Sequence, residues 1–151
     1  MEDVVIKTEK ARFNFRVAVI PYNTDHQVLL QRVKNEEYLS LIGGRVKLGE
    51  TTADALLREV QEELGILINP EKLELVYVCE NFFKMKDKNI HELLFIYKYA
   101  FNSNASFKVV DKENVYTEWQ EIKNLKNLNI KPSIIKNFNI SEKFQHIIII
   151  N

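Results

Sequence analysis

Residues 43–66, GGRVKLGETTADALLREVQEELGI, constrain the fold more than any other part of this sequence. Thr51 or Thr52 can cap the start of a helix, and Asp54 falls in its first turn, where negative charge is favoured. Gly65 stands where helices commonly end in a left-handed residue. The segment therefore predicts one well-delimited helix that follows a glycine-containing loop.

Three glutamates share one side of this helix. At about 100° per residue, Glu63 lies about 40° from Glu59 in one direction and Glu62 about 60° in the other. Exposed like charges at these spacings destabilise a helix by roughly 0.2–0.5 kcal/mol per pair, and Arg58 is the neighbouring cation. A hard divalent cation such as Mg²⁺ or Mn²⁺ would remove the repulsion by binding the carboxylates. A solvated acidic face is the alternative. A separate apolar stripe, suited to burial against a sheet, consists of Leu56, Leu57, Val60 and Leu64.

The rest of the chain reads mainly as strands. β-rich or alternating runs predict strands at 13–20, 27–33, 38–42, 72–85, 90–101, 116–122 and 145–151, with turns at 22–26 and 86–89. Residues 131–139 predict a second helix, with Pro132 in its first turn. One strong helix among many strands indicates a mixed α/β domain with helices packed on sheet faces. At 151 residues, and without a linker or repeat, the chain is expected to form a single domain over 1–151.

Charge and cysteine content exclude several classes of function. Lys plus Arg and Asp plus Glu both number 21, so no general attraction to nucleic acid or to an anionic membrane is expected. No run reaches the roughly 20 apolar residues of a membrane span, and the N-terminus lacks a signal peptide pattern. Cys79 is the single cysteine and lies in an apolar run, which favours a buried, inert thiol. These features predict a cytoplasmic protein.

The spacing within residues 43–66 is more specific than the acidic helix alone. The specified residues are Gly44, Glu50, Arg58-Glu59-Val60, Glu62-Glu63 and Gly65-Ile66. Their spacing is that of the Nudix box, so the segment resembles the Nudix hydrolase family. The resemblance implies an α/β/α sandwich with a mixed sheet, in which the box forms a loop–helix–loop. It also implies a Mg²⁺- or Mn²⁺-dependent enzyme that cleaves a nucleoside diphosphate linked to another group.

The resemblance also implies roles for individual residues. Glu59, Glu62 and Glu63 match the family's metal-binding acids, with Glu59 either a ligand or the base that deprotonates water. Arg58 matches the residue that orients the glutamates through salt bridges. Glu50 matches an acid that supports the loop or reaches a cation through water. The family's paired glycines, Gly43 and Gly44 here, let the backbone turn tightly near the phosphates.

Outside the box the sequence offers weaker candidates. An additional acid at Glu113 or Glu92 could act as base or ligand, with surface charge as the alternative for Glu113. Arg16 could meet a phosphate or form a salt bridge. Further candidates are His91, Glu118 and Trp119. The alternative for Glu118 is a surface charge, and the alternative for Trp119 is a place in the hydrophobic core. The favoured substrate is a (d)NTP, cleaved to a nucleoside monophosphate and pyrophosphate. A nucleoside-diphosphate sugar or ADP-ribose is the alternative substrate, and a non-catalytic nucleotide-sensing module is the alternative function. The chain could also form a homodimer.

Overall fold

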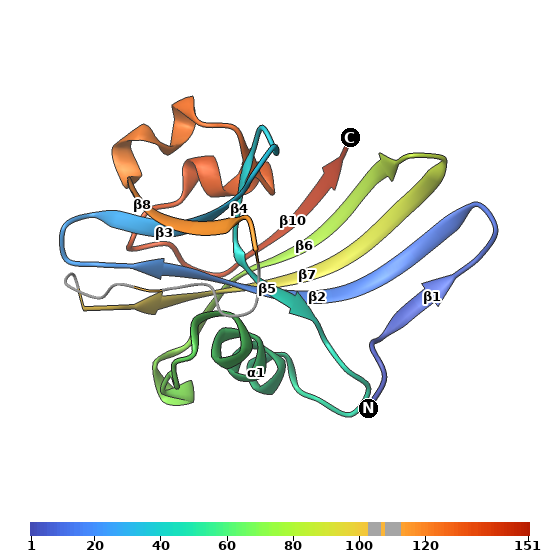
Figure 1. Ribbon diagram of the computed structural model, residues 1–151, viewed down its shortest axis with the longest axis horizontal. Helices are drawn as coiled ribbons and strands as arrows, with labels where there is room; N and C mark the ends of the chain where they lie inside the picture. The colour runs from blue at the N-terminus through green and yellow to red at the C-terminus, as the bar shows by residue number, and fades with distance from the viewer. Residues whose placement is uncertain (103–106, 108–112) are drawn as a thin grey trace.

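The computed structural model describes residues 1–102, 107 and 113–151. Within them the strands join in one mixed sheet, with α1 (Thr52–Leu64) on one face. The short 3-10 helices η2 (Ile122–Asn127) and η3 (Ser133–Asn137) lie on the other face (Figure 1). The strands are β1 (Val5–Lys7), β2 (Ala11–Tyr22), β3 (Gln27–Val33), β4 (Leu39–Ser40), β5 (Ile42–Arg45), β6 (Glu74–Met85), β7 (Lys88–Ala100), β8 (Val115–Glu121), β9 (Ile130–Lys131) and β10 (Gln145–Ile150), and η1 is Pro70–Lys72. The α/β sandwich with a mixed sheet is therefore confirmed.

The sheet runs in the order β10-β6-β7-β2-β3-β4-β9, while β1 and β5 pair with β2, and β8 pairs with β3. β6 and β7 form the long antiparallel hairpin that the sequence predicts. Parallel pairing joins β7 to β2 and β10 to β6, so the C-terminal strand closes one edge of the sheet. β5 pairs antiparallel with the middle of β2, immediately before the chain enters α1.

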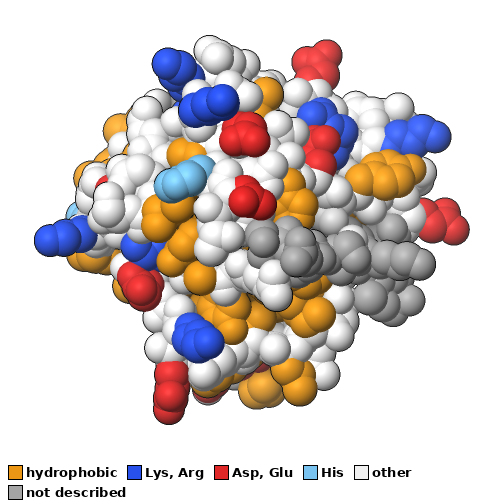
Figure 2. Space-filling view, turned by 90° about the vertical axis from the view of Figure 1, so that its left-hand side faces the viewer, with side chains coloured by type: hydrophobic (Ala, Val, Ile, Leu, Met, Phe, Trp, Pro, Cys, Tyr) orange, Lys and Arg blue, Asp and Glu red, His pale blue; other side chains and the backbone are white. Residues whose placement is uncertain are grey.

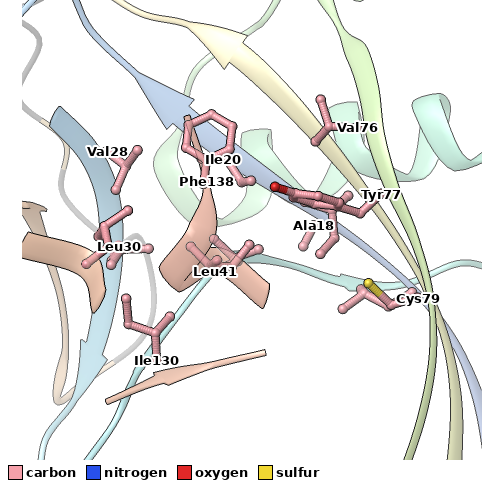
Figure 3. Close-up of a cluster of buried hydrophobic side chains, with 14 of the residues drawn as sticks. Ala18, Ile20, Val28, Leu30, Leu41, Val76, Tyr77, Cys79, Ile130 and Phe138 are labelled. Carbon is pink, nitrogen blue, oxygen red and sulfur yellow. The ribbon is translucent and has the colours of Figure 1, made fainter. Parts of the chain in front are cut away.

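Two cores lie on opposite faces of the sheet because side chains alternate along each strand. Val17 and Val19 of β2 pack in the core beneath α1, whereas Ala18 and Ile20 face the other core. Figure 3 shows this second set, in which Tyr77 and Phe138 lie close to Ile20. Burial raises the pKa of the Cys79 thiol to about 11, with a smaller contribution from Glu92. The prediction of a buried thiol is confirmed.

The predicted helix at 131–139 is wrong in type and length. Residues 133–137 form the 3-10 helix η3, and Pro132 precedes it as the capping residue with no side-chain hydrogen bond. The segment has two consecutive β-branched residues, Ile134 and Ile135, and asparagines at its C-terminal end. Both residue types have low helix propensity, so a short 3-10 segment is held by packing, chiefly by the buried Ile135.

Candidate active site

The local structure of α1 fixes where its acids lie. Thr51 Oγ1 accepts a hydrogen bond from the Asp54 amide at 3.1 Å, and Gly65 closes the helix with φ 69°, as the sequence predicts. Leu56 and Val60 are fully buried against the sheet. Burying each such side chain stabilises the fold by roughly 1.5–3 kcal/mol. The apolar stripe therefore sets the rotation of the helix, and with it the direction of the acidic side.

Arg58 ties the acidic side to the preceding loop. Its Nε and Nη2 donate to Glu50 Oε1 and Oε2 at 2.7 and 3.0 Å, a bidentate pair. Its Nη1 donates to Glu59 Oε1 at 2.8 Å and lies 3.5 Å from Glu62 Oε2. Nη2 also donates to the Arg45 carbonyl at 3.0 Å. One guanidinium thus holds three carboxylates and the end of β5 together.

The electrostatics of this network follow from its hydrogen bonds. The hydrogen bond from Arg58 is the largest cause that holds the pKa of the Glu50 carboxyl below its ordinary value, and a hydrogen bond from the Lys47 amide adds to it. The pKa of Arg58 is raised in return, chiefly by its hydrogen bond with Glu50. The Glu50 side chain is only 9% exposed, so solvent screens this pair weakly.

Gly43 and Gly44 act through close approach. Both lie in β5, and among the described glycines only Gly49 and Gly65 have positive φ, so the expected tight turn at Gly43 and Gly44 is wrong. A Cβ at Gly44 would come within 2.5 Å of the Glu59 carboxylate. A Cβ at Gly43 would lie 2.7 Å from Ala18 Cα in β2. Gly44 therefore gives room to the Glu59 carboxylate, and Gly43 lets β5 pair closely with β2.

The donor set fits a hard divalent cation in kind. Glu59, Glu62 and Glu63 supply three carboxylates from one helix, and the missing Cβ of Gly44 forms a recess for the Glu59 carboxylate. Glu63 is 3% exposed and the Glu62 side chain is about half exposed, so one carboxylate lies in the protein interior and another at the surface. Among the residues that the structure describes, no three side chains of acidic, histidine or cysteine type already surround one point as metal ligands do.

A cleft of about 850 Å³ lies over the core that faces away from α1. Its cationic lining comes from distant parts of the chain: Arg16, Lys84, Lys131 and Lys136. The Lys131 ammonium stands 4.3 Å above the ring of Tyr38, which also lines the cleft. Gly43 belongs to the lining too, so β5 contributes one glycine to the cleft and the next to the recess of Glu59.

Glu92 lies in the floor of this cleft. Strand register sets it directly opposite Asn14 of β2 and Asn81 of β6, which makes a polar row across three strands. Burial raises the pKa of Glu92, and Arg16, 3.9 Å away, and a hydrogen bond from Asn81 oppose that rise. The sequence candidates Glu92 and Arg16 are thus brought together.

The other candidates outside the box lie elsewhere. Glu113 is exposed in the turn before β8 and does not line the cleft. Glu118 forms an ion pair with Arg32 at 2.9 Å, as a surface charge commonly does. His91 points to the opposite face from Glu92, since neighbouring residues of a strand alternate, and it stacks on Phe82. Trp119 packs against the core beneath α1.

Sequence reasoning missed most of the cleft lining. The cleft residue Tyr38 lies in the loop before β4, Gln31 in β3 and Lys131 in β9, and none of these segments carries a motif that points to a site. Asn81 was detectable, because it interrupts an apolar strand with a polar residue on the buried side. On the end of the molecule that Figure 2 shows, acidic and basic side chains are interspersed and neither sign forms a continuous patch.

A family model described as the NUDIX domain matches residues 12–138. The chain is also 28% identical over 118 residues to the "Uncharacterized Nudix hydrolase YvcI" of Bacillus subtilis (strain 168), an alignment that covers 78% of this chain and 72% of that protein.

Solved structures share the fold. The MutT protein of Bacillus halodurans superposes with a TM-score of 0.70 at 20% identity, covering 88% of this chain and 86% of that one. The MutT protein of Methanosarcina mazei Go1 gives 0.62 at 20% identity, with 87% and 92% covered. The dihydroneopterin triphosphate pyrophosphohydrolase of E. coli gives 0.58 at 21% identity, with 82% and 90% covered.

Proposed function

Because this chain belongs to the Nudix family and is a pyrophosphohydrolase, we propose that it cleaves the diphosphate linkage of a nucleotide with Mg²⁺ or Mn²⁺ bound at the glutamates of α1. The observation that carries the proposal is the Arg58 network, in which one guanidinium orients Glu50, Glu59 and Glu62 on one side of β5, while Gly43 of β5 lines a cation-lined cleft on the other side. We propose Glu63 and Glu62 as metal ligands, with Glu59 as ligand or base. A divalent ion held there would neutralise the diphosphate and activate water.

The chain's own residues would do the positioning. Arg58 fixes the Glu59 carboxylate, and Glu50 fixes Arg58, so both acids are set before substrate binds. Preorganised groups of this kind supply most of the acceleration in phosphoryl transfer. Because Gly43 has no side chain, the backbone of β5 is open to the cleft, and because Gly44 has none, it is open to Glu59. We propose that a nucleotide in the cleft passes its phosphates across the backbone of β5, where neither glycine carries a side chain, toward the acids.

The cleft supports a nucleotide of (d)NTP type as the first substrate to test. Among the described side chains that line it, four are cationic and one, Glu92, is a carboxylate, which suits a polyanion, and the Tyr38 ring offers an apolar surface to a base. Two structural neighbours are described as MutT proteins and a third as a triphosphate pyrophosphohydrolase. We propose the cytoplasm as the location, consistent with the one buried cysteine, and a single functional domain. In the part of the chain that is described, no helix is long and apolar enough to cross a membrane.

The test is a screen of (d)NTPs, nucleoside-diphosphate sugars and ADP-ribose with Mg²⁺ or Mn²⁺, with chromatographic detection of nucleoside monophosphate. Turnover of one class, lost in Glu63→Gln and kept in the surface variant Glu71→Gln, is the expected result. Glu71 is exposed beyond the end of α1 and serves as the matched control. Equal turnover by wild type and Glu63→Gln would refute the assignment of Glu63.

A further inference from the structure

A row of apolar and aromatic side chains crosses five strands on the sheet face that carries α1. Pairing places Ile6 opposite Phe13, Phe13 opposite His91, His91 opposite Phe82, and Phe82 opposite Ile150. Residues directly opposite on neighbouring strands project from the same face. The rings are in contact, with centroids 5.2 Å apart for Phe13 and His91 and 4.4 Å for Phe82 and His91.

This row lies where the sheet extends past the helix. In Figure 1 the right-hand parts of β2, β6 and β7 continue well beyond α1. Ile6 and Ile150, at the two ends of the row, are 61% and 79% exposed. Ile148, which shares their face two residues along β10, is 59% exposed. We call this set the Phe82 face: the exposed Ile6, His91, Ile148 and Ile150 together with the partly buried Phe13 and Phe82. Exposed apolar groups contiguous over several strands usually mark an interaction surface.

The Phe82 face has relief as well as apolar character. A hollow of about 360 Å³ borders the row, and Ala11, Asn89, Phe82 and His91 are among its lining residues. Ala11 lies opposite Asn89 in the sheet, so a small side chain leaves the hollow open. Projecting isoleucines and a hollow therefore occur on one surface. A twofold contact requires a surface that is complementary to itself, and this combination meets that requirement.

Charge on this face favours an apolar partner. The nearest carboxylate on the same side of β6 is Glu80, and the His146 imidazole of β10 already binds it. Lys84, on the same side of β6, lines the hollow at the margin of the row. The six side chains of the Phe82 face itself include no carboxylate, lysine or arginine, so apolar contact is the main attraction that the face offers, and a second copy of the same surface supplies it.

We propose that a second copy of this chain packs on the Phe82 face, sheet against sheet, about a twofold axis. Besides the row through Phe82, the contact would take in the rows on either side of it, which run through Glu80 and Lys84. Five strands spaced by about 4.8 Å and these three rows spaced by about 6.8 Å give a projected area of roughly 500 Å² on each copy. The accessible area is larger than its projection, so the two copies together bury more than about 1,000 Å², which is the size that a specific interface requires. Sheets packed in this way form a shared core about 10 Å thick.

The proposal has a structural consequence for β10. Ile147 packs against the core on the other face, and Ile149 lines the substrate cleft, while Ile148 and Ile150 belong to the Phe82 face. β10 lies at the edge of the sheet and is held by β6 on one side. Dimer formation would thus cover the exposed side of a strand whose other side forms a wall of the cleft.

Sedimentation velocity over a wide range of protein concentration tests the proposal without any substrate, and so independently of the proposed activity. The wild type is expected to sediment as a dimer whose fraction rises with concentration, and Ile148→Glu/Ile150→Glu as a monomer. Leu67→Glu, which charges an exposed leucine between α1 and η1, is the matched control and should remain dimeric. Thermal melting confirms that the variants fold.

Two outcomes would overturn the proposal. One is a wild type that stays monomeric at every concentration. Such a monomer that binds neutral phospholipid vesicles would show that the face meets a membrane, and this too would overturn the proposal. The other is a folded Ile148→Glu/Ile150→Glu variant that dimerises as strongly as the wild type. A Phe82→Asp variant adds a charge at the centre of the face and gives a second, independent reading, since its expected effect on dimerisation is at least as large.

Discussion

The two adjacent glycines of β5 should respond to the same substitution in opposite ways. In Gly44→Ala the new Cβ would come within 2.5 Å of the Glu59 carboxylate, whereas ordinary contact begins at 3.4 Å. The carboxylate is the end of a side chain and can retreat by about 1 Å, a misplacement that can cost about 100-fold in rate. That loss corresponds to roughly 2.7 kcal/mol of transition-state stabilisation.

The effect of Gly44→Ala on stability should be small. The retreat lengthens the Arg58–Glu59 hydrogen bond from 2.8 Å, and both side chains are partly exposed. Weakening one such bond costs about 1 kcal/mol, or about 2–4 °C in melting temperature for a chain of this size. Activity is therefore expected to fall by two orders of magnitude while the fold is retained.

Gly43→Ala should do the reverse. Its Cβ would lie 2.7 Å from Ala18 Cα and closer still to the Val17 carbonyl, and these are backbone atoms of the central strand β2. They cannot move without separating two paired strands, and overpacking of this kind costs about 3 kcal/mol, or roughly 6–12 °C. The assay compares kcat with Mg²⁺ and the melting temperature without it for both variants. Wild-type kcat in Gly44→Ala, or equal losses of melting temperature in the two variants, would refute the reasoning.

Three further results are expected. Millimolar Mg²⁺ should raise the melting temperature of the wild type by binding the native state, and the rise should shrink in Glu63→Gln; an unchanged melting temperature in both would contradict metal binding at α1. The pKa of Glu50 is lower in the folded than in the unfolded chain, so its stabilisation is complete above the ordinary value of 4.5 and is lost as the pH falls through the folded-state pKa. Urea titrations should show a shallower acid loss in Glu50→Gln than in the wild type. The Cys79 thiol, with a pKa of about 11 and no exposure, should react with maleimide at neutral pH only after denaturation, as followed by mass spectrometry.

The sequence predicts the elements that local signals define. The cap at Thr51, the left-handed Gly65 and the spacing of the acids fix α1 to within a residue, because each depends on neighbours a few positions away. The strands follow from alternation, as the β6–β7 hairpin shows. The 131–139 segment fails, since its structure depends on packing of Ile135 against distant parts of the chain.

The candidate site divides in the same way. Local spacing placed Glu59, Glu62 and Glu63 on one side of α1, but spacing alone does not show that Gly44 faces Glu59 across two elements. The cleft depends on the order of the strands. The parallel pairing of β2 with β7 is what brings Arg16 and Glu92 together, and no short motif specifies that pairing.

The Arg58 network explains how a helix can carry several acids on one side without being disrupted. The guanidinium reaches the loop through Glu50, the helix through Glu59 and the strand through the Arg45 carbonyl. Glu50 in turn accepts from the Lys47 amide at 2.8 Å, so the loop before α1 is held at both of its ends. A lysine at position 58 could offset the charge but could not serve all these acceptors at once, because an ammonium lacks the planar fork of donors. The geometry of arginine, in addition to its charge, therefore joins the loop, the helix and the strand into one rigid support for the acids.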